Sequence, residues 1–204
     1  MSRLKGSVDA PDETARSLLL ASALKLFNQK GYATTTVREI VADAGVTKPV
    51  LYYYFGNKEG IYLELFEGPL REFEELLEGF SSEGGRTRDK LTALCEATSD
   101  LYRNNLEKAK LLNAVYYGPP QGTPFINFEA YHNKLLDAIG QLVDQGIRAG
   151  EFRELDVQDV TLAIVGVFHI AMDMMLCQAP GITIRQNTLS HVLNIIFQGI
   201  LKKE

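Results

Sequence analysis

Cysteine is scarce in this sequence. The 204 residues include two cysteines, Cys95 and Cys177, which lie far apart and outside any CxxC spacing. Such a pair provides neither a disulfide framework nor a clustered thiolate site for a metal ion. A reducing compartment fits this pattern, so we expect a cytoplasmic protein whose core needs no disulfide support.

Signals for export and membrane insertion are missing as well. The N-terminal sequence MSRLKGSVDAPDETAR has no apolar core of the kind that a signal peptide requires. The most apolar region, residues 160–179, contains His169 and Asp173, and its charge-free run is too short to span a bilayer. We expect this region to form a buried helix, and we expect no membrane partner.

Catalytic motifs are absent too. The sequence has no glycine-rich phosphate loop and no HExxH motif, and its three histidines, His132, His169 and His191, are widely separated. Adjacent acids such as Glu74 and Glu75 fit a solvated helix face. We therefore predict a protein that is not an enzyme and that uses no metal and no cofactor.

Positive charge is in the minority over the whole chain, which has a net charge of −5. Residues 1–60 are the exception, because they hold eight lysines and arginines against six acids and so carry +2. The remaining residues carry −7. This asymmetry indicates a small basic module on a larger acidic body, although a difference of this size also arises by chance.

Strand-like alternation is not found in any segment, and almost every segment has the helical period of 3.6 residues. The sequence predicts an all-α fold of about nine helices, with a first domain of residues 1–60 and a second of residues 61–204. Asp12 or Thr14 can cap the first helix, and Gly31 can end it. The longer helices are expected at residues 61–80 with a kink or break at Gly68–Pro69, and at 88–104, 106–117, 127–149, 156–178 and 185–202.

Two short helices follow the first one. Thr36 and Glu39 have the capping-box pattern at the start of the first short helix, and Gly45 ends it. Thr47 caps the next short helix, which tolerates a proline in its first turn and ends at Gly56. A tight pair of helices behind a packing helix predicts a helix-turn-helix, whose second helix enters the major groove of DNA.

Three consecutive tyrosines stand in this second helix. At 100° per residue, Leu51 and Phe55 share one face and are expected in the core. Tyr53 points the opposite way and must be exposed, where its hydroxyl can reach a phosphate and its ring edge a thymine methyl. Tyr52 and Tyr54 flank the buried face, and Tyr54 is placed to be partly inside.

Other groups near this helix also suit DNA. Pro49 and Val50 are small apolar side chains that fit a thymine methyl, and Lys48 and Lys58 bracket the helix and can hold phosphates. The capped amides of the helix that starts at Thr36 can receive a phosphate as well. The tyrosines alone fit a protein-packing surface equally well, but the helix pair, the caps and the lysines together favour DNA.

The region from Thr14 to about Phe66 resembles the N-terminal domain of the TetR family of bacterial transcriptional regulators. This region is about a quarter of the chain, and the later helices match the family in number and length. The matching runs are Ala23–Phe27, Gly31–Tyr32, Thr35–Ile40, Ala44–Lys48, Leu51–Phe55 and Asn57–Glu59.

The resemblance implies an all-α homodimer that reads a palindromic operator in double-stranded DNA, with one half-site for each subunit. The recognition helix would be Thr47–Phe55. The implied DNA contacts are Thr36, Thr47, Lys48, Pro49, Val50, Tyr52, Tyr53, Tyr54 and Lys58.

In this family the last two long helices usually form a four-helix dimer interface. In this chain both helices are more apolar than one core requires. Their apolar positions are Val160, Ile164, Val167, Phe168, Ala171, Met175, Leu189, Val192, Leu193, Ile196 and Ile200. Two central helices of a monomer would have the same pattern, but the reading of two half-sites favours the interface.

The family usually has a small-molecule pocket between the other helices of the second domain. The candidate lining residues are Tyr102, Tyr116, Tyr117, Phe125, Phe128, Tyr131, His132, Phe168, His169 and Met172. Such pockets are mostly apolar with a few polar groups, and His132 and His169 are suited to orient a polar group of the ligand. Histidines among apolar residues are nevertheless more often ordinary core residues, and the loop at Gly118–Pro124 is either a lid or a connector.

The implied function is transcription regulation, and by family habit repression. A small-molecule effector and the operator would favour different spacings of the two recognition helices, so that each would weaken binding of the other. The alternative is a helical protein–protein adaptor without sequence-specific DNA binding, in which the tyrosines form the contact surface.

Overall fold

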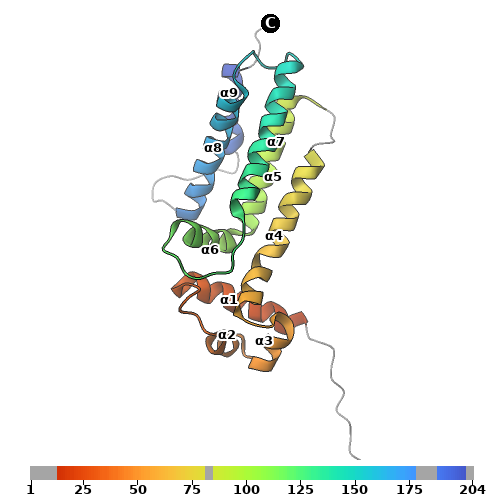
Figure 1. The fold of residues 1–204 in the computed structure, drawn as a ribbon. Coiled ribbons are helices and arrows are strands. Elements are labelled where there is room, and N and C mark those ends of the chain that lie inside the picture. Colours follow the sequence, from red (N-terminus) through yellow and green to blue (C-terminus); the bar gives the residue numbers. More distant parts are fainter. Residues whose placement is uncertain (1–12, 81–84, 178–187, 201–204) are drawn as a thin grey trace, which may run out of the picture. The chain divides into compact units, whose positions relative to one another are not determined.

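A computed structural model describes residues 13–80, 85–177 and 188–200 of the chain (Figure 1). These residues form nine α-helices and no strand, which confirms the predicted all-α class. The helices are α1 (Glu13–Lys30), α2 (Val37–Ala44), α3 (Lys48–Phe55), α4 (Lys58–Phe80), α5 (Thr87–Asn104), α6 (Leu106–Tyr117), α7 (Phe128–Arg148), α8 (Val157–Cys177) and α9 (Thr188–Ile200).

The observed helix ends follow the local signals in most places. Gly31 and Gly45 adopt positive φ at the ends of α1 and α2, as glycine allows without strain. Gly68–Pro69 does not break the chain into two helices, because α4 continues through Pro69, although a proline supplies no backbone N–H to the helix. The predicted first cap at Asp12 and the helix ends near residues 178, 185 and 202 lie outside the described residues.

The chain divides into two compact units. The first unit contains residues 1–67 together with residues 110–125, and the second contains residues 68–109 and 126–204. The segment 110–125 thus joins the first unit although its neighbours in the sequence belong to the second. A simple division after residue 60 does not include this segment in the first unit.

The first unit is built on a small core to which α1, α2, α3 and the start of α4 contribute. Phe27, Tyr32, Tyr62 and Phe66 form a chain of aromatic contacts with centroid separations of 5.1–6.0 Å. The other large buried apolar side chains of these elements are Leu19, Ile40, Val41, Leu51, Phe55, Ile61 and Leu65. Their spacing of three and four residues puts one face of each short helix inside.

The second unit is a helical bundle in which α5, α7, α8 and α9 lie together (Figure 1). Its core takes the apolar face of each helix, for example Leu135, Ile139 and Val143 of α7. Among the described residues, α8 is the one helix that is long and apolar enough to cross a membrane by length and composition. Its buried residues, such as Ile164 and Phe168, belong to this core, as in the core helix of a bundle.

A close approach between α7 and the following turn requires a glycine. Gly146 is buried, and a Cβ added there would lie 2.4 Å from the ring of Phe152. Phe152 is itself buried and stacks on Phe197 of α9, with ring centroids 6.2 Å apart and an interplanar angle of 10°. The ring of Phe152 therefore has little room to give way.

We expect Gly146→Ala to lower the free energy of unfolding by about 1–3 kcal/mol, because the added methyl group overpacks the core. The matched control is Gly140→Ala in the same helix, where the nearest atom to the new Cβ, Oγ1 of Thr161, lies at an ordinary contact distance of 3.5 Å. There the gain in helix propensity of about 1 kcal/mol should dominate. Chemical denaturation of both variants tests this, and equal effects of the two substitutions would contradict it.

Candidate nucleic-acid interface

The start of α2 is fixed by a complete capping box. The backbone N–H of Glu39 donates to Oγ1 of Thr36 at 3.3 Å, and the N–H of Thr36 donates to Oε2 of Glu39 at 2.9 Å. Lys30 also donates to Glu39, and these contacts lower the pKa of Glu39 to about 2, with the Lys30 hydrogen bond as the largest cause. The ionised Glu39 therefore stabilises the fold above pH 4.5, and this contribution is lost as the pH falls towards 2.

The start of α3 is built differently. Thr47 occupies the N-cap position with extended backbone angles, but its side chain makes no capping hydrogen bond. The prediction that Thr47 caps α3 is therefore right for the position and wrong for the side-chain bond. Pro49 lies in the first turn, where the missing N–H has no intrahelical partner to lose. The Thr47 hydroxyl is consequently left available to an external partner.

The side chains of α3 lie as the helical wheel predicts. Leu51 and Phe55 are buried, Tyr53 is 68% exposed, and Tyr52 is 50% exposed. Tyr54 is partly buried and contacts the rings of Tyr53 and Phe55, at centroid distances of 5.2 and 6.0 Å. The helix thus has one buried edge, and its remaining surface presents tyrosines to the outside.

Most cations of the first unit are already paired. Arg16 binds Glu64, Lys30 binds Glu39, and Lys25 binds Asp43 at 2.6 Å. These three ion pairs leave fewer cations of the first unit free to meet an external anion.

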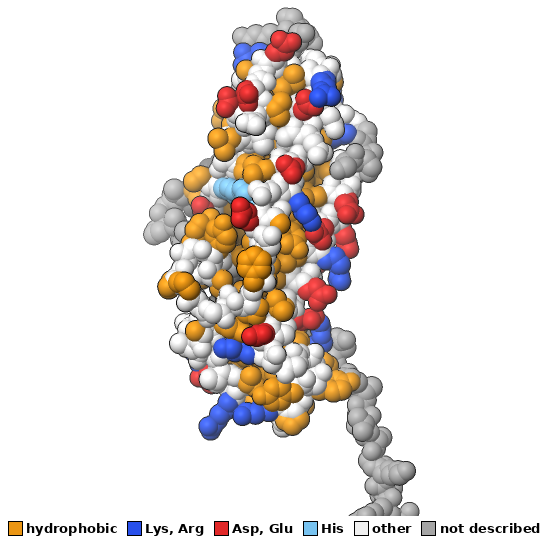
Figure 2. Space-filling model, in the orientation of Figure 1, with side chains coloured by type: hydrophobic (Ala, Val, Ile, Leu, Met, Phe, Trp, Pro, Cys, Tyr) orange, Lys and Arg blue, Asp and Glu red, His pale blue; other side chains and the backbone are white. Residues whose placement is uncertain are grey.

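Two exposed cations of the first unit have no ion pair or side-chain hydrogen bond within its described residues. They are Lys48, at the start of α3, and Arg38, in the first turn of α2. Arg38 was absent from the predicted contacts. Its position two residues after Thr36, with no acid four residues away, was a signal that could have identified it. Figure 2 shows basic and hydrophobic side chains together at the end of the view that carries α1, α2 and α3.

Lys58 has a structural partner that the sequence did not reveal. Its Nζ donates to the carbonyls of Tyr32 at 2.9 Å and Thr35 at 3.0 Å, and it lies 4.1 Å from the centroid of the Tyr32 ring. Burial lowers the pKa of Lys58. Two of the three N–H groups of this ammonium are therefore occupied, and the third makes no hydrogen bond within the described residues.

The candidate ligand residues are divided between the two units. Tyr116, Tyr117 and Phe125 belong to the first unit and are exposed. The other candidates belong to the second unit, where Phe168 and Met172 are buried in the core and Tyr102, Phe128 and Tyr131 are partly buried. The structure therefore does not bring all ten residues into one described cavity.

His132 and His169 do come together. Their rings stack with centroids 4.9 Å apart and an interplanar angle of 20°, and Phe168 lies beside them with its ring centroid 6.1 Å from that of His169. Burial lowers the pKa of His169, and the neighbouring His132 lowers it further, while Asp173 opposes the shift. Both histidines are exposed on one side, so their rings are accessible to a polar partner.

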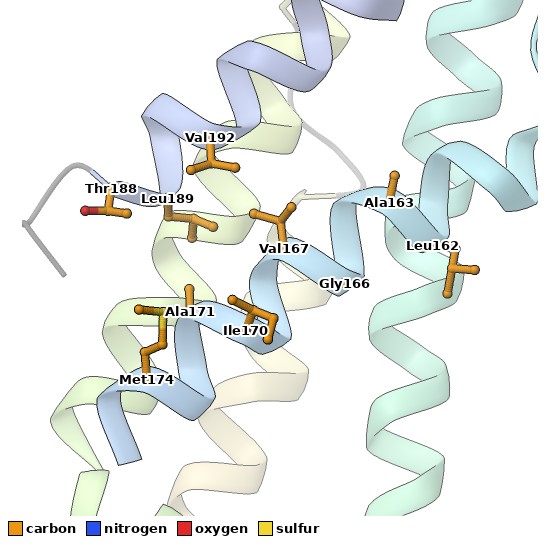
Figure 3. A pocket seen from close by; sticks show the side chains of 10 residues that line it. All are labelled: Leu162, Ala163, Gly166, Val167, Ile170, Ala171, Met174, Thr188, Leu189 and Val192. Carbon is orange, nitrogen blue, oxygen red and sulfur yellow. The ribbon is translucent and has the colours of Figure 1, made fainter. Parts of the chain in front are cut away.

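The apolar surface of α8 and α9 contains an open groove of about 410 Å³. Figure 3 shows Val167 and Ala171 of α8 facing Leu189 and Val192 of α9 across this groove. Its full lining is Leu162, Ala163, Gly166, Val167, Ile170, Ala171, Met174, Thr188, Leu189 and Val192. None of the ten candidate ligand residues lines it, whereas the four facing residues belong to the predicted dimer face.

The fold and the exposed face of α3 define a class of protein, which is the helix-turn-helix transcriptional regulators. Residues 19–65 match the family model described as bacterial regulatory proteins, tetR family. Together with the likeness of the whole chain to curated regulators, this match shows that residues 19–65 form a helix-turn-helix domain of the TetR type.

Similarity extends well beyond the N-terminal region. The uncharacterized HTH-type transcriptional regulator YdgC of Bacillus subtilis is 28% identical over 193 residues, which are 93% of this chain and 94% of YdgC. The HTH-type transcriptional activator FasR of Mycolicibacterium smegmatis is 29% identical over 160 residues, 76% of this chain and 71% of FasR. The solved SmeT–triclosan complex superposes with a TM-score of 0.70 at 19% identity, over 93% of each chain.

The two N-caps lead to different expectations. Thr36→Ala should lower the free energy of unfolding by about 1 kcal/mol, because it removes the acceptor for the Glu39 amide. Thr47→Ala should cost clearly less, because the Thr47 hydroxyl makes no such bond. Chemical denaturation of the two variants under the same conditions is the measurement. A larger loss for Thr47→Ala than for Thr36→Ala would show that α3, and not α2, depends on its cap side chain.

Proposed function

We propose that the chain is a cytoplasmic repressor that binds a palindromic operator as a homodimer and is released by a small-molecule effector. The observation that carries the proposal is the exposed face of α3. This face presents Tyr52, Tyr53 and the unpaired Lys48, and burial of Leu51 and Phe55 holds it in place. A helix that is held in the core by one edge and exposes its opposite face can enter a major groove.

The proposed contacts fall into two groups. Lys48 and Arg38, the remaining N–H of Lys58, and the hydroxyls of Thr36 and Thr47 hold phosphates and so fix the position of the helix on the duplex. The side chains proposed to face the bases are Pro49, Val50, Tyr52, Tyr53 and Tyr54. These are apolar or aromatic groups, which suit thymine methyls and base edges more than they suit charge.

A second copy of the chain is the proposed occupant of the groove on α8 and α9. Leu162 and Ile170 line this groove and are 68% and 61% exposed, although they are large apolar side chains, and Ile195 of α9 is 68% exposed as well. An apolar surface of this kind on a soluble bundle marks an interaction site. Pairing α8 and α9 with the same helices of a second copy gives a two-fold interface, and the two half-sites of a palindrome need that symmetry.

The proposed effector binds in the second domain, which we take to begin at residue 61. It is a largely apolar small molecule with a polar group that meets the edge of the His132–His169 pair. SmeT, a structural neighbour, was solved with triclosan bound, which supports a small-molecule site in this fold. FasR is named an activator, so the regulators similar to this chain are not all repressors. The repression proposed for this chain requires that binding of the effector weakens binding of the operator.

The DNA contact is tested by the affinity for an operator obtained by selection from a random duplex pool. Lys48→Ala should weaken binding and reduce the slope of log K against log salt by about 0.9, because one phosphate contact is lost. Tyr53→Ala should cost about 1–3 kcal/mol and relax the sequence preference, whereas Tyr53→Phe should retain the ring contribution.

The control for charge is Arg148→Ala, which removes one positive charge from an exposed position of α7 in the second unit. It should leave the operator affinity unchanged. If no sequence is enriched and Lys48→Ala behaves like Arg148→Ala, then the adaptor alternative holds and DNA recognition is wrong.

The dimer is tested at Ile170. Ile170→Glu places a charge in the proposed interface twice, once from each copy, and should raise the dimer dissociation constant at least roughly 100-fold. Analytical ultracentrifugation over a concentration series measures this. The control is Leu63→Glu, at a position that is 43% exposed on α4 in the first unit. A wild-type chain that stays monomeric, or a dimer that Ile170→Glu leaves intact, argues against this interface.

A further inference from the structure

The segment 110–125 has an unusual place in the chain. It belongs to the first unit, but residue 109 before it and residue 126 after it belong to the second. The segment contains most of α6 and the start of the connection to α7. Any movement of the chain at residues 109 or 126 therefore reaches the first unit through this segment, in addition to α4.

One side chain of this segment is bonded to the turn between α1 and α2. The backbone N–H of Tyr32 donates to Oε1 of Gln121 at 2.8 Å, although the two residues are 89 positions apart. Tyr32 is buried, so its amide would lose its partner if Gln121 moved away. Gly31 leaves the space for this contact, because a Cβ on Gly31 would lie 2.7 Å from the same oxygen.

The other side of the turn is held from α4. Lys58 donates to the carbonyls of Tyr32 and Thr35, and the Thr35 hydroxyl donates to the carbonyl of Gly31 at 2.8 Å. The next residue is Thr36, the N-cap of α2. The turn is thus fixed by Gln121 at its first amide and by Lys58 at its carbonyls, and it leads directly into the proposed phosphate site.

A second contact of the same connection lies two residues further on. Burial raises the pKa of Tyr62, and a side-chain interaction with Thr123 partly offsets this rise. The Tyr62 hydroxyl is fully enclosed, and within the described parts of the chain no hydrogen bond of normal geometry satisfies it. Gln121 therefore supplies the well-formed bond between this connection and the first unit.

We propose that Gln121 is a positioning residue for DNA binding: it ties the α6–α7 connection to the turn that places the N-terminus of α2. Displacement of this connection breaks the Gln121–Tyr32 bond, loosens the turn and removes the phosphate contact at Thr36. This proposal depends on the proposed DNA binding, and it assigns the transmission of the effector signal to one named hydrogen bond.

The experiment compares three variants of the full chain on the selected operator. Gln121→Met keeps the side-chain length and removes the acceptor, and it should weaken operator binding at least fivefold at a temperature where the protein is fully folded. Gln121→Glu keeps an acceptor oxygen and should bind within twofold of wild type. Gln141→Met, on the exposed face of α7, is the control for the chemical change and should bind like wild type.

Two further readouts separate this role from a merely structural one. The loss in Gln121→Met should leave the salt slope unchanged, because a neutral acceptor is lost, whereas Lys48→Ala removes a cation and reduces the slope. Amide hydrogen exchange at Tyr32 should accelerate in Gln121→Met and not in Gln121→Glu.

The possible failures are distinguishable. If the wild type binds no operator, the proposed function fails and this inference fails with it. If the wild type binds and Gln121→Met binds equally well despite faster exchange at Tyr32, DNA binding holds and the positioning role of Gln121 is wrong. Weaker binding that Gln121→Glu does not rescue also overturns the proposal, because the acceptor oxygen would then not be the cause.

Discussion

The ammonium of Lys58 sits on the carbonyls of Tyr32 and Thr35 and over the ring of Tyr32, and much of the first unit depends on this contact. A turn between two helices leaves carbonyls that neither helix can satisfy, and a buried unpaired carbonyl is costly. The first residue of α4 satisfies two of them with one cation. It thereby joins α4 to the turn before α2, so the position of the DNA-facing helices is linked to the long helix that continues into the second unit.

Much of the first unit could be read from the sequence because its signals are local. The capping box at Thr36, the glycine at residue 45 and the wheel position of Tyr53 each depend on residues fewer than ten positions apart. Lys58 could not be assigned in this way, since its partners lie 26 and 23 positions earlier, and an exposed basic side chain near a recognition helix resembles a phosphate contact. The Gln121 contact spans 89 positions and has no local signal at all.

The ligand candidates were less predictable for a related reason. Aromatic side chains at helical spacing predict that one face of the helix is buried. The spacing does not predict which unit of the protein that face packs against. Phe168 and Met172 face the bundle core, and Tyr117 and Phe125 belong to the other unit and are exposed. An apolar excess on α8 and α9 was predicted, but most of the positions named for the dimer face, such as Ile164 and Leu193, lie in the core of the bundle. The large apolar residues that are exposed there, Leu162, Ile170 and Ile195, were not among the named positions. α8 is long and apolar enough to span a membrane by length and composition, but the core helix of a bundle passes the same test, and one face of α8 is packed in such a core.

The distribution of charge bears on how the proposed regulator would be switched. Ion pairs occupy Arg16, Lys25 and Lys30, so the free positive charge of the described first unit is concentrated on Lys48 and Arg38, and the rest of the chain beyond residue 60 is acidic. A protein with few phosphate contacts binds DNA weakly without regard to sequence, because the electrostatic part of the affinity grows with the number of phosphates neutralised. The affinity for an operator must then come mainly from the fit of α3 and the α2 N-terminus, and fit is sensitive to small displacements. In the proposed function, an effector that shifted these elements would need a difference of only a few kcal/mol between its binding free energies for the two states to empty the operator site.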